Sequence, residues 1–212
     1  MLKIQKLYKQ DVLDSSKDKK LKKFTEFETK YKIDTDRQYE FKDLVEKIQD
    51  LKDFCYVEGP DVYWTKGKEN FQRFRRAAHD KNGKAWLTNK FKSSEANNNI
   101  RLEHNIRVDK TPDQEIASYV ESLGFKYNFT IYKNCHIYRF ADATLVYYSV
   151  RDEKGKRTNF IEIEVDEATI DKYTENEAWE IVKKYEKVLE PLGIKAQNRL
   201  RKSLFEMYRR EI

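Results

Sequence analysis

Charged and apolar residues alternate through residues 24–33, FTEFETKYKI, so that charges of both signs recur at every second position. Successive side chains of a β-strand point to opposite faces, so an alternating segment has one charged and one apolar face. The apolar face holds Thr25, Phe27, Tyr31 and Ile33. The charged face holds Glu26, Glu28, Lys30 and Lys32. This segment therefore predicts a strand with two carboxylates and two ammonium groups on one side.

The same alternation recurs in residues 71–76, 85–92, 99–108 and 158–166. A sheet with one face in water accounts for one or two such strands, but five need another explanation. If the sheet closes on itself, the charged faces line a lumen and the apolar faces pack against helices outside. The polar residues on these faces are Arg73, Arg75, Thr88, Lys90, Lys92, Arg101, Glu103, Asn105, Arg107, Glu162, Glu164 and Asp166.

A lumen of this kind predicts a particular chemistry. Carboxylates that converge from alternate residues suit a hard cation such as Mg²⁺ or Mn²⁺, which bridges carboxylates to phosphates. Arginines and lysines on neighbouring strands would neutralise those phosphates. Charges of both signs in one enclosed space are costly unless a metal and a polyanion complete the balance. The candidate metal ligands are Glu26, Glu28, Glu162 and Glu164.

The remaining patterns predict the elements that position these charges. Strands are expected at residues 24–33, 54–64, 70–78, 84–92, 99–109, 126–139, 143–151 and 158–166, the second of them interrupted at Gly59-Pro60. Asn82-Gly83 predicts a hairpin, and Lys154-Gly155-Lys156 joins the last two strands. The absence of βαβ alternation indicates an α+β fold. We expect a closed eight-stranded antiparallel β-barrel with helices packed outside.

Helices are expected at residues 37–51, at about 112–123, and over about 167–210 with a break at Pro191–Gly193. Asp36 can cap the first helix. Thr111 and Gln114 have the spacing of a capping box for the second, and Gly124 can end it.

Composition limits the alternatives. The chain has 212 residues, 39% of them apolar and 38% charged, and its 14 Tyr and 12 Phe indicate a folded domain. No apolar run is long enough to span a membrane, and the N-terminus does not resemble a secretory signal. Cys55 and Cys135 do not form a disulfide framework, so we expect a cytoplasmic protein.

The net charge of +6 comes mostly from residues 1–23, which carry eight lysines and three aspartates. We therefore expect a basic N-terminal arm at 1–23 and one domain at 24–212. Because the domain itself carries little net charge, the composition gives only weak support for nucleic-acid binding.

The run Glu26-Phe27-Glu28-Thr29-Lys30 resembles the ExExK signature of the CYTH superfamily, or triphosphate tunnel metalloenzymes. This family includes class IV adenylyl cyclases, thiamine triphosphatases, inorganic tripolyphosphatases and fungal-type RNA triphosphatases. Further segments resemble family motifs in the family's order, and together they cover about residues 24–207. These segments are Asp61-Val62-Tyr63-Trp64 (DxYF), Arg73-x-Arg75, Leu87-Thr88-x-Lys90 (TxK), Arg101-x-Glu103 (RxE), Phe160-Ile161-Glu162-Ile163-Glu164 (EIE) and the stretch Lys202–Met207 (KSYxxLL).

The resemblance implies roles for these positions. Glu26, Glu28, Glu162 and Glu164 would be the catalytic, metal-binding carboxylates, assisted by Glu103. The phosphate contacts would be Lys30, Arg73, Arg75, Lys90, Arg101 and Lys133, with Lys92 and Arg139 as weaker candidates. Two positions depart from the family: Tyr148 replaces the usual aspartate, and Cys135 follows Lys133 where an arginine is frequent. These departures leave open whether one metal site or phosphate contact is altered.

Three functions stay open. The favoured one is hydrolysis of a triphosphate on a nucleotide, thiamine triphosphate, an RNA 5′ end or inorganic tripolyphosphate, because attack by water demands less of a site than orienting a ribose hydroxyl. The alternatives are an adenylyl cyclase and a non-catalytic binder of phosphorylated ligands or RNA. Homodimers occur in the family, and the sequence leaves the oligomeric state open. No glycine-rich P-loop is present, which argues against a Walker-type NTPase.

Overall fold

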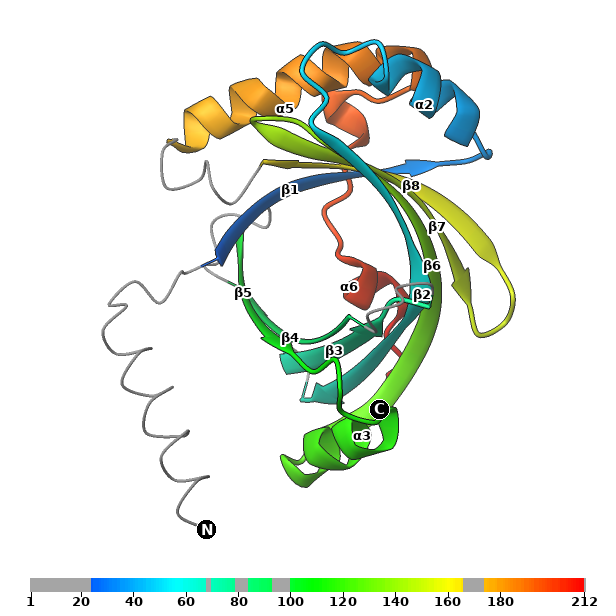
Figure 1. Ribbon diagram of the computed structural model, residues 1–212, viewed down its shortest axis with the longest axis vertical. Coiled ribbons are helices and arrows are strands. Elements are labelled where there is room, and N and C mark those ends of the chain that lie inside the picture. Colours follow the sequence, from blue (N-terminus) through cyan, green and yellow to red (C-terminus); the bar gives the residue numbers. More distant parts are fainter. Residues whose placement is uncertain (1–23, 68–69, 79–83, 93–99, 166–173, 212) are drawn as a thin grey trace.

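The computed structural model describes residues 24–67, 70–78, 84–92, 100–165 and 174–211 (Figure 1). Eight antiparallel strands form one sheet in the order β1-β5-β4-β3-β2-β6-β7-β8, and β1 also pairs with β8 to close a barrel. The expected N-terminal arm, Asn82-Gly83 and Asp166 lie outside the described residues. The strands are β1 (Phe24–Ile33), β2 (Asp53–Lys66), β3 (Asn70–Arg76), β4 (Ala85–Lys92), β5 (Ile100–Arg107), β6 (Lys126–Arg139), β7 (Ala143–Asp152) and β8 (Arg157–Val165).

Four α-helices are described: α2 (Gln38–Val45), α3 (Asp113–Ser122), α5 (Glu175–Leu189) and α6 (Leu204–Tyr208). Short 3₁₀ helices η1 (Glu190–Leu192) and η2 (Ala196–Asn198) connect the last two. The α+β class and the eight antiparallel strands predicted from the sequence are confirmed, and each strand ends within two residues of its expected position. No helix in the described ranges has both the length and the apolar character that crossing a membrane requires.

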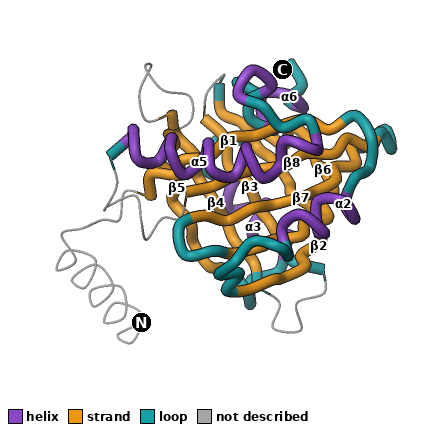
Figure 2. Tube along the Cα trace, turned by 90° about the horizontal axis from the view of Figure 1, so that it is seen from above, coloured by secondary structure: helices purple, strands orange, loops and turns teal. Residues whose placement is uncertain are grey.

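Apolar strand faces pack against helices outside the barrel, as the alternation predicts. Helices α5 and α2 lie over β1, β8 and β7 (Figures 1 and 2). Tyr31 and Ile163 belong to the buried cluster beneath them, together with Phe41 of α2 and Val182 of α5. A second outer cluster joins α3 to β2, β3 and β4. Burial of these faces removes apolar surface from water and leaves the opposite strand faces for the lumen.

Strand β2 runs unbroken through Gly59-Pro60, so the expected interruption is wrong. Gly59 pairs with Lys133 and Pro60 with Tyr132. The glycine has φ +156°, and a Cβ placed on it would lie 2.3 Å from the backbone oxygen of Arg76. A glycine is therefore needed because the end of β3 passes close to β2, and it does not mark a turn.

Two expected helix features also need correction. Helix α2 ends at Val45 and not at residue 51, because the Ile48 N–H donates to the Val45 oxygen at 3.1 Å in a tighter turn. Asp36 does accept a hydrogen bond from the Gln38 N–H at 3.1 Å. The capping box predicted at Thr111 is wrong because Pro112 takes the N-cap position of α3, without a side-chain bond.

Gly124, with φ +83°, directly follows the C-cap of α3, in agreement with the sequence prediction.

The C-terminal segment joins the barrel wall. In the described part of the chain, β1 pairs with β5 through Phe24–Phe27, and Arg199 forms a bridge with Tyr31 farther along. The Leu200 N–H also donates to the Lys30 oxygen at 2.7 Å. A buried carboxylate, Glu186 of α5, fixes this junction: it accepts the Tyr31 hydroxyl at 2.5 Å and both the Nε and Nη2 of Arg199 at 2.6 and 2.7 Å.

Beyond this junction, α6 lies inside the ring of strands (Figure 1). Phe205 stacks on Phe71 with ring centroids 4.3 Å apart, and Leu204 belongs to the same buried cluster as Phe129. The Asn128 side-chain amide then holds the backbone of Arg210 at 2.8 and 3.2 Å. The expectation that the helices pack outside is therefore wrong for α6, which fills one end of the lumen with apolar side chains.

Gly59→Ala should lower the free energy of unfolding by on the order of 3 kcal/mol, because the Arg76 backbone oxygen cannot move away without disturbing β3. Gly155→Ala is the matched control, since Gly155 has φ +82° but no atom within 4 Å of the added Cβ. It should cost only about 1 kcal/mol of backbone strain. Urea denaturation measures both, and equal small losses would contradict the close approach.

Candidate active site in the lumen

The strand register determines which predicted residues share the lumen. Glu28 lies opposite Glu164, and Lys30 lies opposite Glu162, across the β1–β8 pair. Directly opposed residues of antiparallel strands project from the same face. The charges that the sequence placed on separate strand faces therefore come from adjacent strands and point into one space.

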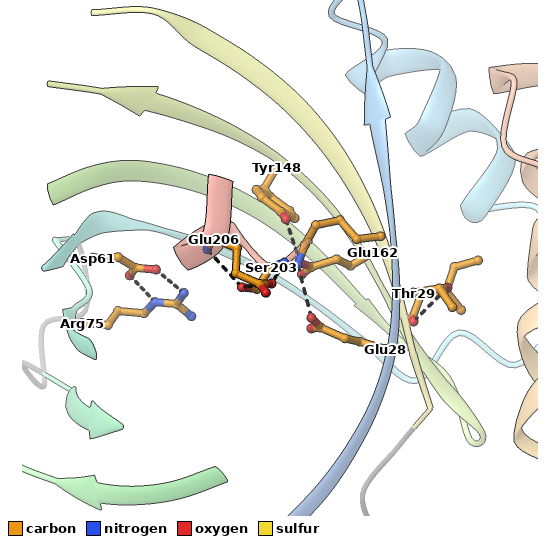
Figure 3. Close-up of polar contacts among 10 residues, drawn as sticks. Glu28, Thr29, Asp61, Arg75, Tyr148, Glu162, Ser203 and Glu206 are labelled. Carbon is orange, nitrogen blue, oxygen red and sulfur yellow. Dashed lines mark hydrogen bonds and ion pairs between the residues drawn. The ribbon is translucent and has the colours of Figure 1, made fainter. Parts of the chain in front are cut away.

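Lys30 lies at the centre of a buried charged cluster, and Figure 3 shows three other members of it, Glu28, Glu162 and Tyr148. Its Nζ is 2.7 Å from Glu162 Oε1 and 3.2 Å from Glu28 Oε1. The Tyr148 hydroxyl donates to the same Glu162 oxygen at 2.7 Å. Lys30 is 5% exposed and Tyr148 is fully buried. One ammonium thus joins two carboxylates from strands at opposite ends of the sequence.

The charges in this cluster stabilise one another. Burial and the charge of Glu28 raise the pKa of Glu162, but the charge and hydrogen bond of Lys30, together with the charge of Lys133, outweigh them, so the pKa is lowered. Burial, followed by the charge of Glu162, raises the pKa of Tyr148 well above its ordinary value. At neutral pH, therefore, Glu162 is an anion that accepts a hydrogen bond from a protonated tyrosine.

Tyr148 also links this cluster to a second cation. The Lys133 Nζ lies 4.0 Å from the centroid of the Tyr148 ring, within cation–π range. Phe160 stacks on the same ring at 5.3 Å. Tyr148 stands where the resembling motif usually has an aspartate. It thus contacts both Glu162, a candidate metal ligand, and Lys133, a candidate phosphate-binding residue.

Arg75 has a buried partner that the sequence analysis missed. Its Nε and Nη2 donate to the two carboxylate oxygens of Asp61 at 2.5 and 2.6 Å (Figure 3). Burial would raise the pKa of Asp61, but the charge and hydrogen bonds of Arg75 outweigh it, with help from Arg73 and Lys133, and lower it to about 2. The alternation of Asp61 with Tyr63 could have placed this carboxylate on the inward face.

Arg73 follows the same face of β3. Its Nη2 donates to Thr88 Oγ1 at 3.3 Å, and Thr88 donates to Asn105 at 2.6 Å. Backbone pairing sets Glu26 opposite Arg101 and Lys90 opposite Glu103. The side chains of Glu26, Lys90, Lys92, Arg101 and Glu103 lie outside the described part of the structure.

The lumen opens at the end opposite α6 into a cavity of 580 Å³. Arg75 and Lys133 line it beside Trp86, and the two cysteines, Cys55 and Cys135, also contribute to its wall. Since Lys133 lines this cavity and lies against Tyr148, a ligand in the cavity can reach the charged cluster.

The donor chemistry of the cluster fits a hard divalent cation. The carboxylates of Glu28 and Glu162 approach a single point, which the Lys30 ammonium holds, and carboxylate oxygens are the ligands that Mg²⁺ prefers. Among the described residues, no three acidic, histidine or cysteine side chains are already arranged as a metal cage. A metal would therefore require Lys30 to move away from these two carboxylates.

Solved structures of other proteins share this fold. No protein-family description and no curated protein matches the chain. Among solved structures, a conserved hypothetical protein from Pyrococcus furiosus is 24% identical with a TM-score of 0.64, over 85% of this chain and 98% of its own. A Pyrococcus horikoshii protein is 25% identical with a TM-score of 0.59, over 87% and 99%.

A protein from Vibrio parahaemolyticus, described as a proposed adenylate cyclase, is 15% identical with a TM-score of 0.59, over 86% of this chain and 97% of its own. This chain shares the fold of these three proteins. The near-complete coverage on both sides means that this shared fold accounts for most of the chain. Within it, the described part of the lumen buries the Lys30 cluster, the Asp61–Arg75 pair and Lys133.

Tyr148→Phe should lower the free energy of unfolding of this domain by about 1–2 kcal/mol, because the Glu162 carboxylate loses a buried donor. Tyr39→Phe, at a side chain that is 81% exposed, should change it by less than about 0.5 kcal/mol. Urea unfolding at neutral pH measures both. A Tyr148→Phe protein as stable as the wild type would show that the hydroxyl contributes nothing to holding Glu162.

The Asp61–Arg75 pair predicts a loss of stability in acid. Asp61 has a pKa of about 2 in the folded protein, below its ordinary value, so the pair stabilises the fold above about pH 4 and this contribution disappears between about pH 4 and 2. The loss from this one group should be about 2 kcal/mol. Wild type and Asp61→Asn, compared by urea unfolding from pH 6 to 2.5, should converge in stability; parallel curves would contradict the pair.

Proposed function

We propose that this chain hydrolyses a triphosphate-containing substrate within the barrel, with Mg²⁺ or Mn²⁺ as cofactor. The observation that carries the proposal is the buried Lys30 ammonium between Glu28 and Glu162, with Lys133 nearby in the same lumen. A site with cations and anions this close is built to divide its contacts between a polyanion and a metal. The CYTH-like motifs and fold support the same reading.

Each residue has a role in this proposal. Lys30, Lys133 and Arg73 neutralise the phosphate oxygens, and Arg75 orients them while it stays paired with Asp61. Glu28, Glu162 and Glu164 would hold the metal, which when bound polarises the phosphoryl group and offsets its negative charge. Glu26 and Glu103, predicted from the sequence, would complete the ligand set, and Lys90 and Arg101 the phosphate contacts.

Lys30 changes partners when the substrate enters. In the structure it neutralises Glu28 and Glu162, which keeps the carboxylates together without a ligand. The triphosphate supplies new anionic partners for this ammonium, and the carboxylates are then available to the metal. Water attacks the terminal phosphorus, the bond from this phosphorus to the bridging oxygen breaks, and inorganic phosphate forms as the water loses a proton to solvent. The lumen cations stabilise the charge on the bridging oxygen, which leaves with the diphosphate-containing product.

An adenylyl cyclase is the second candidate, favoured by the likeness of the fold to the Vibrio parahaemolyticus protein described above. Its reaction would use the same lumen, with the ribose 3′-hydroxyl replacing water as nucleophile and pyrophosphate as the leaving group.

The deciding experiment incubates the purified full-length chain with ATP, tripolyphosphate, thiamine triphosphate or an RNA with a 5′-triphosphate, each with Mg²⁺ or Mn²⁺. Inorganic phosphate that depends on the metal would support the hydrolase. Formation of cyclic AMP and pyrophosphate would instead support the adenylyl cyclase. Tight binding with no product from any substrate would overturn both and leave a non-catalytic binder.

Glu28→Ala and Glu164→Ala should each reduce metal-dependent turnover by on the order of a hundredfold or more, because each removes a carboxylate assigned to the metal. The fold should survive, since these glutamates carry like charges on adjacent strands. Glu190→Ala, at an exposed glutamate of η1, is the matched control and should keep the wild-type rate. Wild-type turnover in either lumen variant would refute the assignment.

A further inference from the structure

The mouth of the lumen contains an aromatic side chain next to the innermost cations. Trp86 lies opposite Arg75 in the β3–β4 pair, so both project from the same face. Trp86, Arg75 and Lys133 all line the cavity of 580 Å³. The tryptophan is 37% exposed, which leaves part of its surface available to a ligand.

A second contact holds this indole in place. The guanidinium of Arg107, its partner on β5, lies 5.5 Å from the Trp86 ring centroid. A cation over one aromatic face fixes the plane of the ring and adds a positive charge beside it. The ring is therefore a rigid, partly exposed flat surface at the cavity wall, as a stacking site requires.

The charges around the cavity favour an anionic ligand over a cationic one. Four cationic side chains line it and only two acidic ones. Two of these cations have carboxylate partners: Arg139 pairs with Asp53 at 2.6 Å, and Arg75 pairs with the buried Asp61 at 2.5 Å. A thiamine group carries a positive charge and would be repelled by this cationic excess. A neutral heterocycle on a triphosphate would not be repelled.

The spacing of Trp86 and Arg75 and the volume of the cavity fit a ligand that contacts both side chains. Opposed residues on antiparallel strands have Cα atoms about 5 Å apart, so one ligand can contact both Arg75 and Trp86. The cavity size falls within the usual range for sites that bind small organic molecules. Tripolyphosphate would leave this aromatic wall without a contact.

We infer that the mouth cavity binds the base of a nucleoside triphosphate, stacked on Trp86, while the phosphates extend inward to Arg75, Lys133 and Lys30. This inference rests on the proposed function, since it names the substrate class of the same site. Trp86 is then the residue that distinguishes a nucleotide from inorganic tripolyphosphate.

The test measures binding, so that it does not depend on turnover. The ligands are ATP, tripolyphosphate and thiamine triphosphate with methylene groups in place of the bridging oxygens, titrated with Mg²⁺ by calorimetry into the full-length chain. The variants are Trp86→Leu, which keeps apolar volume without an aromatic face, and Trp86→Phe, which keeps an aromatic face. Tyr119→Leu, at an aromatic side chain of α3 that is 54% exposed, is the control.

Trp86→Leu should weaken the binding of the ATP analogue about tenfold relative to the binding of the tripolyphosphate analogue, because base stacking is lost. Trp86→Phe should restore most of that ratio, and Tyr119→Leu should leave it unchanged. An unchanged ratio in Trp86→Leu, or tighter binding of the thiamine analogue than of the ATP analogue, would overturn the inference and leave the proposed function standing. Failure of all three ligands to bind the wild type would overturn the proposed function as well.

Discussion

The ammonium of Lys30, buried between the carboxylates of Glu28 and Glu162, is the interaction on which the charged lumen depends. Two anions from neighbouring strands would repel each other inside a barrel if no cation lay between them. One lysine compensates both, and the hydroxyl of Tyr148 adds a second donor to Glu162. The chain can thus fold around its own charges and keep them close enough to bind a ligand.

The same strand connects the lumen to the outside of the barrel. Lys30 points inward, whereas the next residue, Tyr31, points outward and donates to Glu186 of α5. The backbone of Lys30 also accepts from Leu200, at the start of the segment that leads into α6. A few consecutive residues of β1 therefore join the charged cluster, the helical layer and the helix that fills one end of the lumen. These contacts keep the polar groups of the lumen buried beside the apolar end that α6 fills.

Much of the fold follows from one sequence signal, the period of two in the strands. In β8, for example, Glu162 and Glu164 alternate with Ile163, so the pattern alone separates the residues of the lumen from those of the outer core. Contacts between distant segments carry no such local signal: neither the Asp61–Arg75 pair nor the place of Phe205 inside the ring could be deduced from spacing. Gly59 was misread because a glycine beside a proline normally marks a turn, whereas here it allows another strand to pass close by.

The central claim is that Lys30 gives up its carboxylates to a metal when a triphosphate arrives, and Mn²⁺ affinity tests it most directly. The free Mn²⁺ signal in electron paramagnetic resonance is corrected for the Mn²⁺ that the methylene analogue of tripolyphosphate binds without protein. It should then show at least a roughly tenfold tighter Mn²⁺ affinity of the protein when the analogue is present, and Glu162→Gln should abolish this gain. An Mn²⁺ affinity that is the same with and without the analogue, or a gain that persists in Glu162→Gln, would contradict the account.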